Sequence, residues 1–146
     1  MSQPHLAITT TLPNQGALAY AEVTALQIST NGSLGIGLCA ADGSPPLTQL
    51  VSDNGSAMPP LTAGQRVGIA YNQNTGNAWA RINGGAWLGG GDPVAGTSPT
   101  ATGISGPQYV SCAVGEFSSS SQVVLAAMLA AFVDAVPSGY SSWSSQ

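Results

Sequence analysis

The chain is 146 residues long, which is the length of a single domain, and 43% of its residues are apolar, enough for a packed core. It contains no lysine, and its two arginines and six acidic residues leave a net charge of −4. Two cations cannot neutralise enough phosphates to bind nucleic acid, and a negative net charge disfavours anionic membranes, so neither is expected as a partner.

Charged residues make up only 5% of the chain, whereas a typical domain has about a quarter. An isolated protein usually stays soluble through surface charge, and a surface of Ser, Thr, Gly, Asn and Ala is better suited to being covered by neighbouring subunits. We therefore expect the chain to work inside a large assembly; an ordinary monomer is the alternative. The N-terminal MSQPHLAITTT lacks the basic and apolar regions of a signal peptide, which predicts synthesis and assembly in the cytoplasm.

Turn signals such as LPNQG, TNGS, DNGS and NQNTGN recur about every ten residues. The short runs between them are rich in β-branched and aromatic residues and are expected to be strands: residues 5–11, 18–29, 33–40, 66–72, 77–83 and 108–117. Many short strands at this spacing predict an all-β sandwich or barrel. Neither a linker nor a repeat divides the sequence, so we predict one domain over residues 1–146, with a short N-terminal arm over about residues 1–15.

The clearest local prediction is a hairpin over residues 66–83. Apolar side chains alternate along both of its strands and are expected to face the core, namely Val67, Ile69, Tyr71, Ala78, Ala80 and Ile82. Trp79, Arg81 and Asn83 share the opposite face. The pair Asn83-Gly84 is a strong turn signal, so a short third strand is predicted over residues 86–88.

Three further side chains in the predicted strands have expected structural roles. Cys39 and Cys112 are expected to be buried free thiols, because a cytoplasmic compartment does not favour a disulfide. Glu22 shares a face of its strand with Tyr20. Its carboxylate is expected to bond to backbone groups or to one of the arginines, and a ligand-binding role is the alternative.

Residues 121–136, SQVVLAAMLAAFVDAV, carry conflicting signals. Their alanine, leucine and methionine content is typical of a helix, and Ser121 is a suitable cap. Nearly every position is apolar, however, so the segment has no amphipathic stripe that would indicate a helix. Composition alone favours a helix over these residues.

Six segments, taken in order, match the pattern of one known family. GALAYAEVT (16–24) matches a GxxYxEV opening strand, and LGIGL (34–38) matches a vGig strand. GQRVGIAYNQNTGNAWARING (64–84) matches a GDvIGvAlDxdtGklwfxkNG hairpin, and WLGGGDPVAGTSP (87–99) matches the loop that follows it. GISGPQYVSCAV (103–114) and FVDAVPSGYSSW (132–143) match its later strands. Together they resemble the SPRY-like domains of bacteriophage structural proteins, and the resemblance spans Gly16 to Trp143.

The resemblance implies an antiparallel jelly-roll sandwich of the SPRY/concanavalin A-like kind. It also implies a strand through QVVLA (122–126) followed by a loop, in place of the helix that composition favours. The chain departs from the family pattern at Leu125 to Met128, where LAAM replaces aNFG. Finally, the resemblance places the chain among the components of tailed phages.

Few residues are suited to catalysis or to metal binding. His5 is the only histidine, the sequence has no GxSxG motif, and its six carboxylates are scattered over separate turns and strands. It also contains no Cys/His cluster and no EF-hand pattern. We therefore expect no catalytic residue, no metal site and no cofactor.

The glycine-rich loop over residues 83–99 is expected to be a folded connection, with Gly89 to Gly91 at positive φ and Asp92 accepting backbone N–H bonds. The candidate binding residues are Trp79, Arg81, Trp87 and Asp92. Aromatic rings and arginine are enriched in interfaces, and the rim loops of sandwiches commonly carry binding sites. The alternative for Trp79 is burial beneath another part of the same chain.

These features predict a non-enzymatic structural protein of a tailed bacteriophage virion. Its expected role is a decoration or cement-like protein of the capsid or tail that assembles through polar, uncharged surfaces. Its expected partners are other virion proteins and further copies of itself in a homo-oligomer. The alternative is a receptor- or glycan-binding module of a tail fibre or spike, in which Trp79, Arg81 and Trp87 hold a host surface sugar.

Overall fold

The computed structural model of the chain describes residues 6–9, 13–27, 33–41, 48–52, 61–115, 122–126 and 131–143. Over these residues the protein is all-β, with one short 3-10 turn, η1, at Leu88–Gly90. The strands are β1 (Leu6–Thr9), β2 (Leu18–Gln27), β3 (Ser33–Ala40), β4 (Thr48–Ser52), β5 (Arg66–Asn72), β6 (Asn77–Ile82), β7 (Gln108–Gly115), β8 (Gln122–Ala126) and β9 (Ser141–Ser142).

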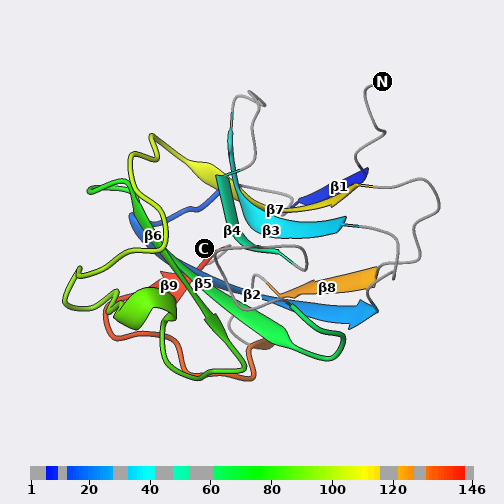
Figure 1. Ribbon diagram of the computed structural model, residues 1–146. Helices are drawn as coiled ribbons and strands as arrows, with labels where there is room; N and C mark the ends of the chain where they lie inside the picture. Colours follow the sequence, from blue (N-terminus) through cyan, green and yellow to red (C-terminus); the bar gives the residue numbers. More distant parts are fainter. Residues whose placement is uncertain are drawn as a thin grey trace.

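The described strands form two sheets that pack together (Figure 1). Sheet A has the order β1-β7-β3-β4, and its pairings are antiparallel. Sheet B has the order β6-β5-β2-β8, also antiparallel, and β9 pairs in parallel with β2. The predicted all-β fold is confirmed, and the two layers are consistent with a β-sandwich. β1 falls inside the predicted N-terminal arm, so this part of the arm is a strand of sheet A.

The core lies between the sheets and uses one face of each. Every second residue of β2 from Ala19 to Ala25 is fully buried in it, because successive side chains of a strand point to opposite faces. Trp143, at the end of the described chain, joins this core and stacks on Tyr71, with ring centroids 6.1 Å apart. The Trp143 indole Nε1 donates to the carbonyl of Gln108 at 3.1 Å, so its burial leaves no unsatisfied donor.

The hairpin predicted over residues 66–83 is confirmed by β5 and β6, and its predicted core residues all pack in the core, with Ile82 only partly buried. The third strand predicted over residues 86–88 is wrong. A single bridge joins Trp87 to Arg81, and the chain then turns through η1. Gly89 and Gly90 have φ values of 66° and 72°, and this left-handed backbone curls the chain away from β6.

Residues 122–126 form β8, which pairs with β2. The strand implied by the family resemblance is therefore confirmed, and the helix favoured by composition is not formed over these residues. Pairing with a central strand outweighs the helix propensity of the segment. Residues 121 and 127–130 of the same segment lie outside the described part of the chain.

The sequence analysis did not identify β4. Leu50 and Val51 are adjacent in this strand and both fully buried, because its register against β3 shifts between Ile36 and Gly37. Such an irregular strand shows no alternation that would reveal it. A side chain at Gly37 would collide with the Thr48 carbonyl, so the close approach of the two strands requires a glycine there.

The two thiols lie on opposite sides of sheet A. Cys39 pairs in register with Tyr109, three residues from Cys112, so the two side chains point to opposite faces. Cys112 lies in the core, and its burial raises the pKa of its thiol to about 12. Cys39 is half-buried, with its Sγ 3.4 Å from the Ser111 hydroxyl. Both are free thiols, as predicted, but only Cys112 is fully buried.

Candidate functional site

The outer face of sheet B, away from sheet A, carries the side chains that alternate with the core residues of β2, β5 and β6. The register aligns them in two rows across the three strands: Tyr20, Ala70 and Trp79, and Glu22, Gly68 and Arg81. This face therefore brings together two of the predicted site residues, Trp79 and Arg81, with a buried tyrosine and a buried carboxylate.

Residues 131–140, here called the strap, cross this outer face (Figure 1). Glu22 is only 2% exposed and anchors the strap through its carboxylate. Its Oε2 accepts from the backbone N–H of Val133 at 3.0 Å, and its Oε1 accepts from the backbone N–H of Asp134 at 2.9 Å. Oε1 also accepts from the Tyr20 hydroxyl at 3.1 Å. The prediction that Glu22 bonds to backbone is confirmed, and three donors compensate the burial of its charge.

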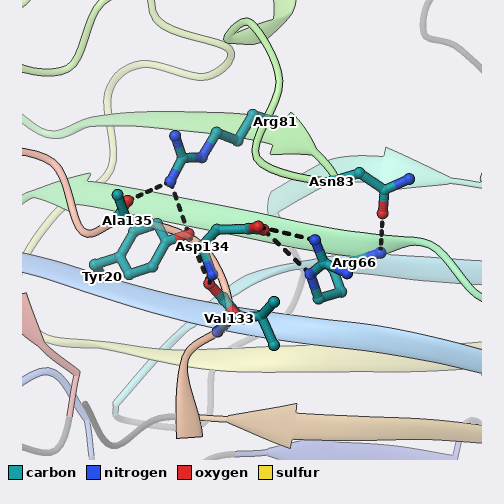
Figure 2. A network of polar contacts seen from close by, with 8 residues as sticks. Tyr20, Arg66, Arg81, Asn83, Val133, Asp134 and Ala135 are labelled. Carbon is teal, nitrogen blue, oxygen red and sulfur yellow. Dashed lines mark hydrogen bonds and ion pairs between the residues drawn. The ribbon is translucent and has the colours of Figure 1, made fainter. Parts of the chain in front are cut away.

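Both arginines also bond to the strap (Figure 2). Arg66 forms a bidentate ion pair with Asp134, in which Nη2 lies 2.8 Å from Oδ1 and Nε lies 3.3 Å from Oδ2. Arg81 donates through Nη2 to the carbonyl of Ala135 and, at 3.1 Å, to the Tyr20 hydroxyl. The only two arginines of the sequence are thus occupied in holding one segment of the same chain.

Tyr20 links the carboxylate to Arg81. Burial raises the pKa of its hydroxyl to about 12, so the group is protonated at neutral pH. It can therefore donate to Glu22 while it accepts from Arg81. The Phe132 ring of the strap packs edge-on against the Tyr20 ring, with ring centroids 5.1 Å apart and an interplanar angle of 85°.

Trp79 does not lie on an open surface. Its side chain is 0% exposed, and its indole Nε1 donates to the carbonyl of Thr97 at 2.8 Å. The alternative reading, burial beneath the same chain, is the one that the structure bears out. The covering segment is the rim loop, defined here as residues 83–100. A Cβ on Gly91 of this loop would lie 2.8 Å from Cδ1 of Trp79, so the absence of a side chain there lets the backbone pass over the indole.

The rim loop is a folded connection, as predicted. Asp92 Oδ1 accepts from the backbone N–H groups of Val94 and Ala95 at 2.8 and 3.1 Å, as expected for an aspartate that forms a turn. Asp92 and Thr97 also exchange two backbone hydrogen bonds of 3.0 Å. Gly91, with φ −70°, does not have the positive φ predicted for it. Asp92 is therefore an exposed turn residue at the edge of the face.

Arg81 and Trp87 are in contact. The guanidinium carbon of Arg81 lies 4.6 Å from the centroid of the Trp87 ring and 5.5 Å from that of Tyr20. Such a cation–π contact holds the half-buried indole at the edge of sheet B. The buried Nε of Arg81 has no hydrogen-bond partner, so the arginine is fixed by its Nη2 bonds and by these two rings.

The structure thus brings together Trp79, Arg81 and Trp87 and connects Asp92 to them through Thr97. It also adds residues that the sequence analysis did not select: Tyr20, Arg66, Phe132 and Asp134. Arg66 and Asp134 carried one signal in the sequence, the scarcity of charge, because a partly buried arginine is expected to pair with a carboxylate, as Arg66 does. Arg81 bonds instead to the Tyr20 hydroxyl and the Ala135 carbonyl. Nothing in the sequence indicated that the strap would supply these partners.

Among the described residues, no group of three or more His, Cys, Asp or Glu side chains is placed to hold a metal ion. Over the same part of the chain, the structure has no helix long and apolar enough to cross a membrane. Comparison with known proteins found no protein-family model that matches the chain and no similar curated protein.

Proposed function

We propose that the chain is a non-enzymatic structural protein of a tailed bacteriophage virion, where it decorates the capsid or the tail. The phage context comes from the sequence resemblance between Gly16 and Trp143. The same resemblance supports a SPRY-like, concanavalin A-like jelly roll as the finer description of the two-sheet sandwich. In the virion the chain assembles with its neighbours through polar, uncharged surfaces.

One observation carries the assembly role: both arginines are used inside the molecule. Arg66 pairs with Asp134, and Arg81 bonds to Tyr20 and to the Ala135 carbonyl. The sequence has no lysine, so the chain has no further lysine or arginine to form a salt bridge with a carboxylate of a partner. Contacts between copies of the chain must then come mainly from shape, apolar burial and backbone hydrogen bonds, and salt weakens such contacts little.

The state of the reactive groups supports a non-enzymatic role. Both oxygens of the Glu22 carboxylate accept hydrogen bonds from the chain itself. The pKa values of Tyr20 and of Cys112 are raised by burial to about 12, far from the range useful for proton transfer or thiolate attack at neutral pH. These groups stabilise the fold rather than perform chemistry.

The alternative, a glycan-binding module, rests on Trp87. This indole is half-buried at the edge of the outer face, where a sugar ring can stack on an aromatic side chain. The other three candidate binding residues are less suited to such a site. Trp79 is fully buried, and Arg81 and Asp92 already bond to the chain.

The experiment that tests the proposal is quantitative mass spectrometry of purified particles of the phage that encodes the chain. A decoration protein is present in hundreds of copies, which resist a wash at high salt. Absence from the particle, or release at moderate salt, would contradict the proposal. A few copies confined to the tail tip, with glycan-array binding lost on Trp87→Ala but kept on Gln49→Ala, would favour the alternative. Gln49 is exposed on β4 of sheet A and serves as the matched control.

A further inference from the structure

The strap is flanked in the chain by two strands that both pair with β2. Strand β8 precedes it, and β9 follows it directly. Just beyond β9, Trp143 is fully buried in the core between the sheets. Lifting the strap away from sheet B can therefore leave both of its ends attached, and it does not require the two sheets to separate.

The strap itself contributes no side chain to the main core. No residue of the strap is fully buried, although it covers Tyr20, which is 0% exposed. Its half-buried side chains, Phe132, Val136 and Tyr140, pack on a small second cluster around Tyr20 and Trp79 on the outer face. Segments with few buried apolar contacts open at a lower free energy than core strands do. The strap therefore has the properties of a segment that opens before the sandwich unfolds.

In the described part of the chain, the strap bonds to sheet B through three consecutive residues, 133–135, which we call the latch (Figure 2). Glu22 accepts from the N–H groups of the first two residues at 3.0 and 2.9 Å. The side chain of the second, Asp134, pairs with Arg66, and the carbonyl of the third accepts from Arg81. Because these bonds hold neighbouring peptide groups, breaking one loosens the backbone that the others hold. The latch is therefore expected to release as one unit.

The state of the latch decides whether the cations of the chain are occupied. Arg66 and Arg81 are the only arginines, and the sequence has no lysine. Both guanidinium groups are bonded to the latch, so its release frees both from the strap at once. Release also removes the two backbone donors of the Glu22 carboxylate. The closed protein thus keeps its cations in bonds to its own chain, whereas an opened one presents them to solvent.

We propose that the strap is a cover that opens as one unit while both sheets stay folded, and that the latch controls access to Arg66 and Arg81. This device goes beyond the proposed function, because it gives the chain a second state with different contacts available. In the open state the two arginines can form salt bridges with carboxylates of another molecule, which the closed state prevents.

Hydrogen exchange of the full chain at low denaturant concentrations tests the proposal. The amides of Val133 and Asp134 are expected to exchange about a hundredfold or more faster than those of β5, a strand paired on both sides. Their exchange is also expected to depend less on denaturant, because opening the strap exposes little surface. Tyr140→Phe removes the bond from the far end of the strap to the rim loop. It is expected to accelerate both latch amides by the same factor, about fivefold.

Ile36→Val is the matched control, because it weakens the sandwich without touching the strap. Ile36 lies on β3 and is fully buried in the main core, so its truncation is expected to accelerate the β5 amides about fivefold. The latch amides are expected to exchange at the wild-type rate, since the strap opens from the folded sandwich.

A dicarbonyl reagent that modifies guanidinium groups tests the access to Arg81. Asp134→Ala removes the ion pair of the latch and is expected to raise the rate of Arg81 modification about tenfold, because the strap is open more often. Ile36→Val is expected to leave this rate unchanged.

The proposal is wrong if Ile36→Val accelerates the latch amides as much as those of β5, because the strap then opens only when the whole protein unfolds. It is also wrong if Tyr140→Phe accelerates one latch amide without the other, since the strap then frays piecewise. Equal modification of Arg81 in the wild-type chain and in Asp134→Ala would show that the latch does not control access. The copy number of the chain in particles, which tests the proposed function, is independent of each of these results.

Discussion

The substitution Glu22→Gln isolates the anchor of the strap, because it changes the charge and one acceptor of the side chain at nearly constant volume. Glu22 is 2% exposed and accepts from Val133 N, Asp134 N and the Tyr20 hydroxyl at 3.0, 2.9 and 3.1 Å. A glutamine keeps one acceptor oxygen and places an NH₂ group against at least one of these donors. Hydrogen bonds to a charged group contribute about 1.5–3 kcal/mol each, so losing one and weakening the others costs about 3 kcal/mol.

Urea unfolding measures this loss as a change in midpoint at constant m-value, and the melting temperature is expected to fall by about 10 °C. Hydrogen exchange at the Val133 and Asp134 amides is expected to accelerate, since these are the N–H groups that Glu22 holds. Asp92→Asn is the matched control: its amide oxygen still accepts from the loop, so it is expected to cost less than about 0.5 kcal/mol. Equal effects of the two substitutions would refute the role assigned to Glu22.

Two other predictions concern buried groups. Gly91→Ala introduces a Cβ 2.5 Å from the Ser98 carbonyl oxygen and 2.8 Å from Cδ1 of Trp79, and it is expected to cost about 1–3 kcal/mol and to shift the tryptophan fluorescence. Gly64→Ala, outside the rim loop at φ 89° and with no atom within 4 Å, adds backbone strain alone and is expected to leave the fluorescence unchanged. An unshifted spectrum for Gly91→Ala would contradict the contact between the loop and Trp79. The pKa of Cys112 rises from 9.0 unfolded to about 12 folded, so the unfolded state loses its proton first and stability falls as pH rises from about 9 to 12. Cys112→Ala is expected to flatten this decline, and an unchanged slope would exclude Cys112 as its source; at pH 8 a thiol reagent is expected to modify Cys39 before Cys112.

The strands with regular alternation could be predicted from the sequence. β3 and β5 have the predicted bounds, and the predicted core face of the hairpin over residues 66–83 is the observed one. These elements follow from the period of two and from turn residues, both of which are local. β4 was missed because its register shift places Leu50 and Val51 in the core together. β8 could be predicted only from the family resemblance, because the composition of its segment is typical of a helix.

The candidate site was predictable only in part. Trp79 and Arg81 are two residues apart on one strand, so strand geometry predicts that they share a face, as they do. The expected hydrogen bond between Glu22 and a backbone group is also present. The sequence did not reveal that the strap returns over this face, because a contact between Glu22 and Val133 spans 111 residues. The sequence pattern therefore indicates an exposed Trp79, whereas the side chain packs beneath the rim loop. Contacts of this kind depend on topology, which local patterns do not encode.

The most direct test of the central claim, that this charge-poor sandwich is built to be covered by neighbouring subunits, is a residue-level structure of the intact particle. We expect the chain in many copies on the capsid or tail, at contacts with neighbouring subunits that contain few ion pairs. A particle that lacks the chain, or that carries it with its surface largely open to solvent, would contradict the account.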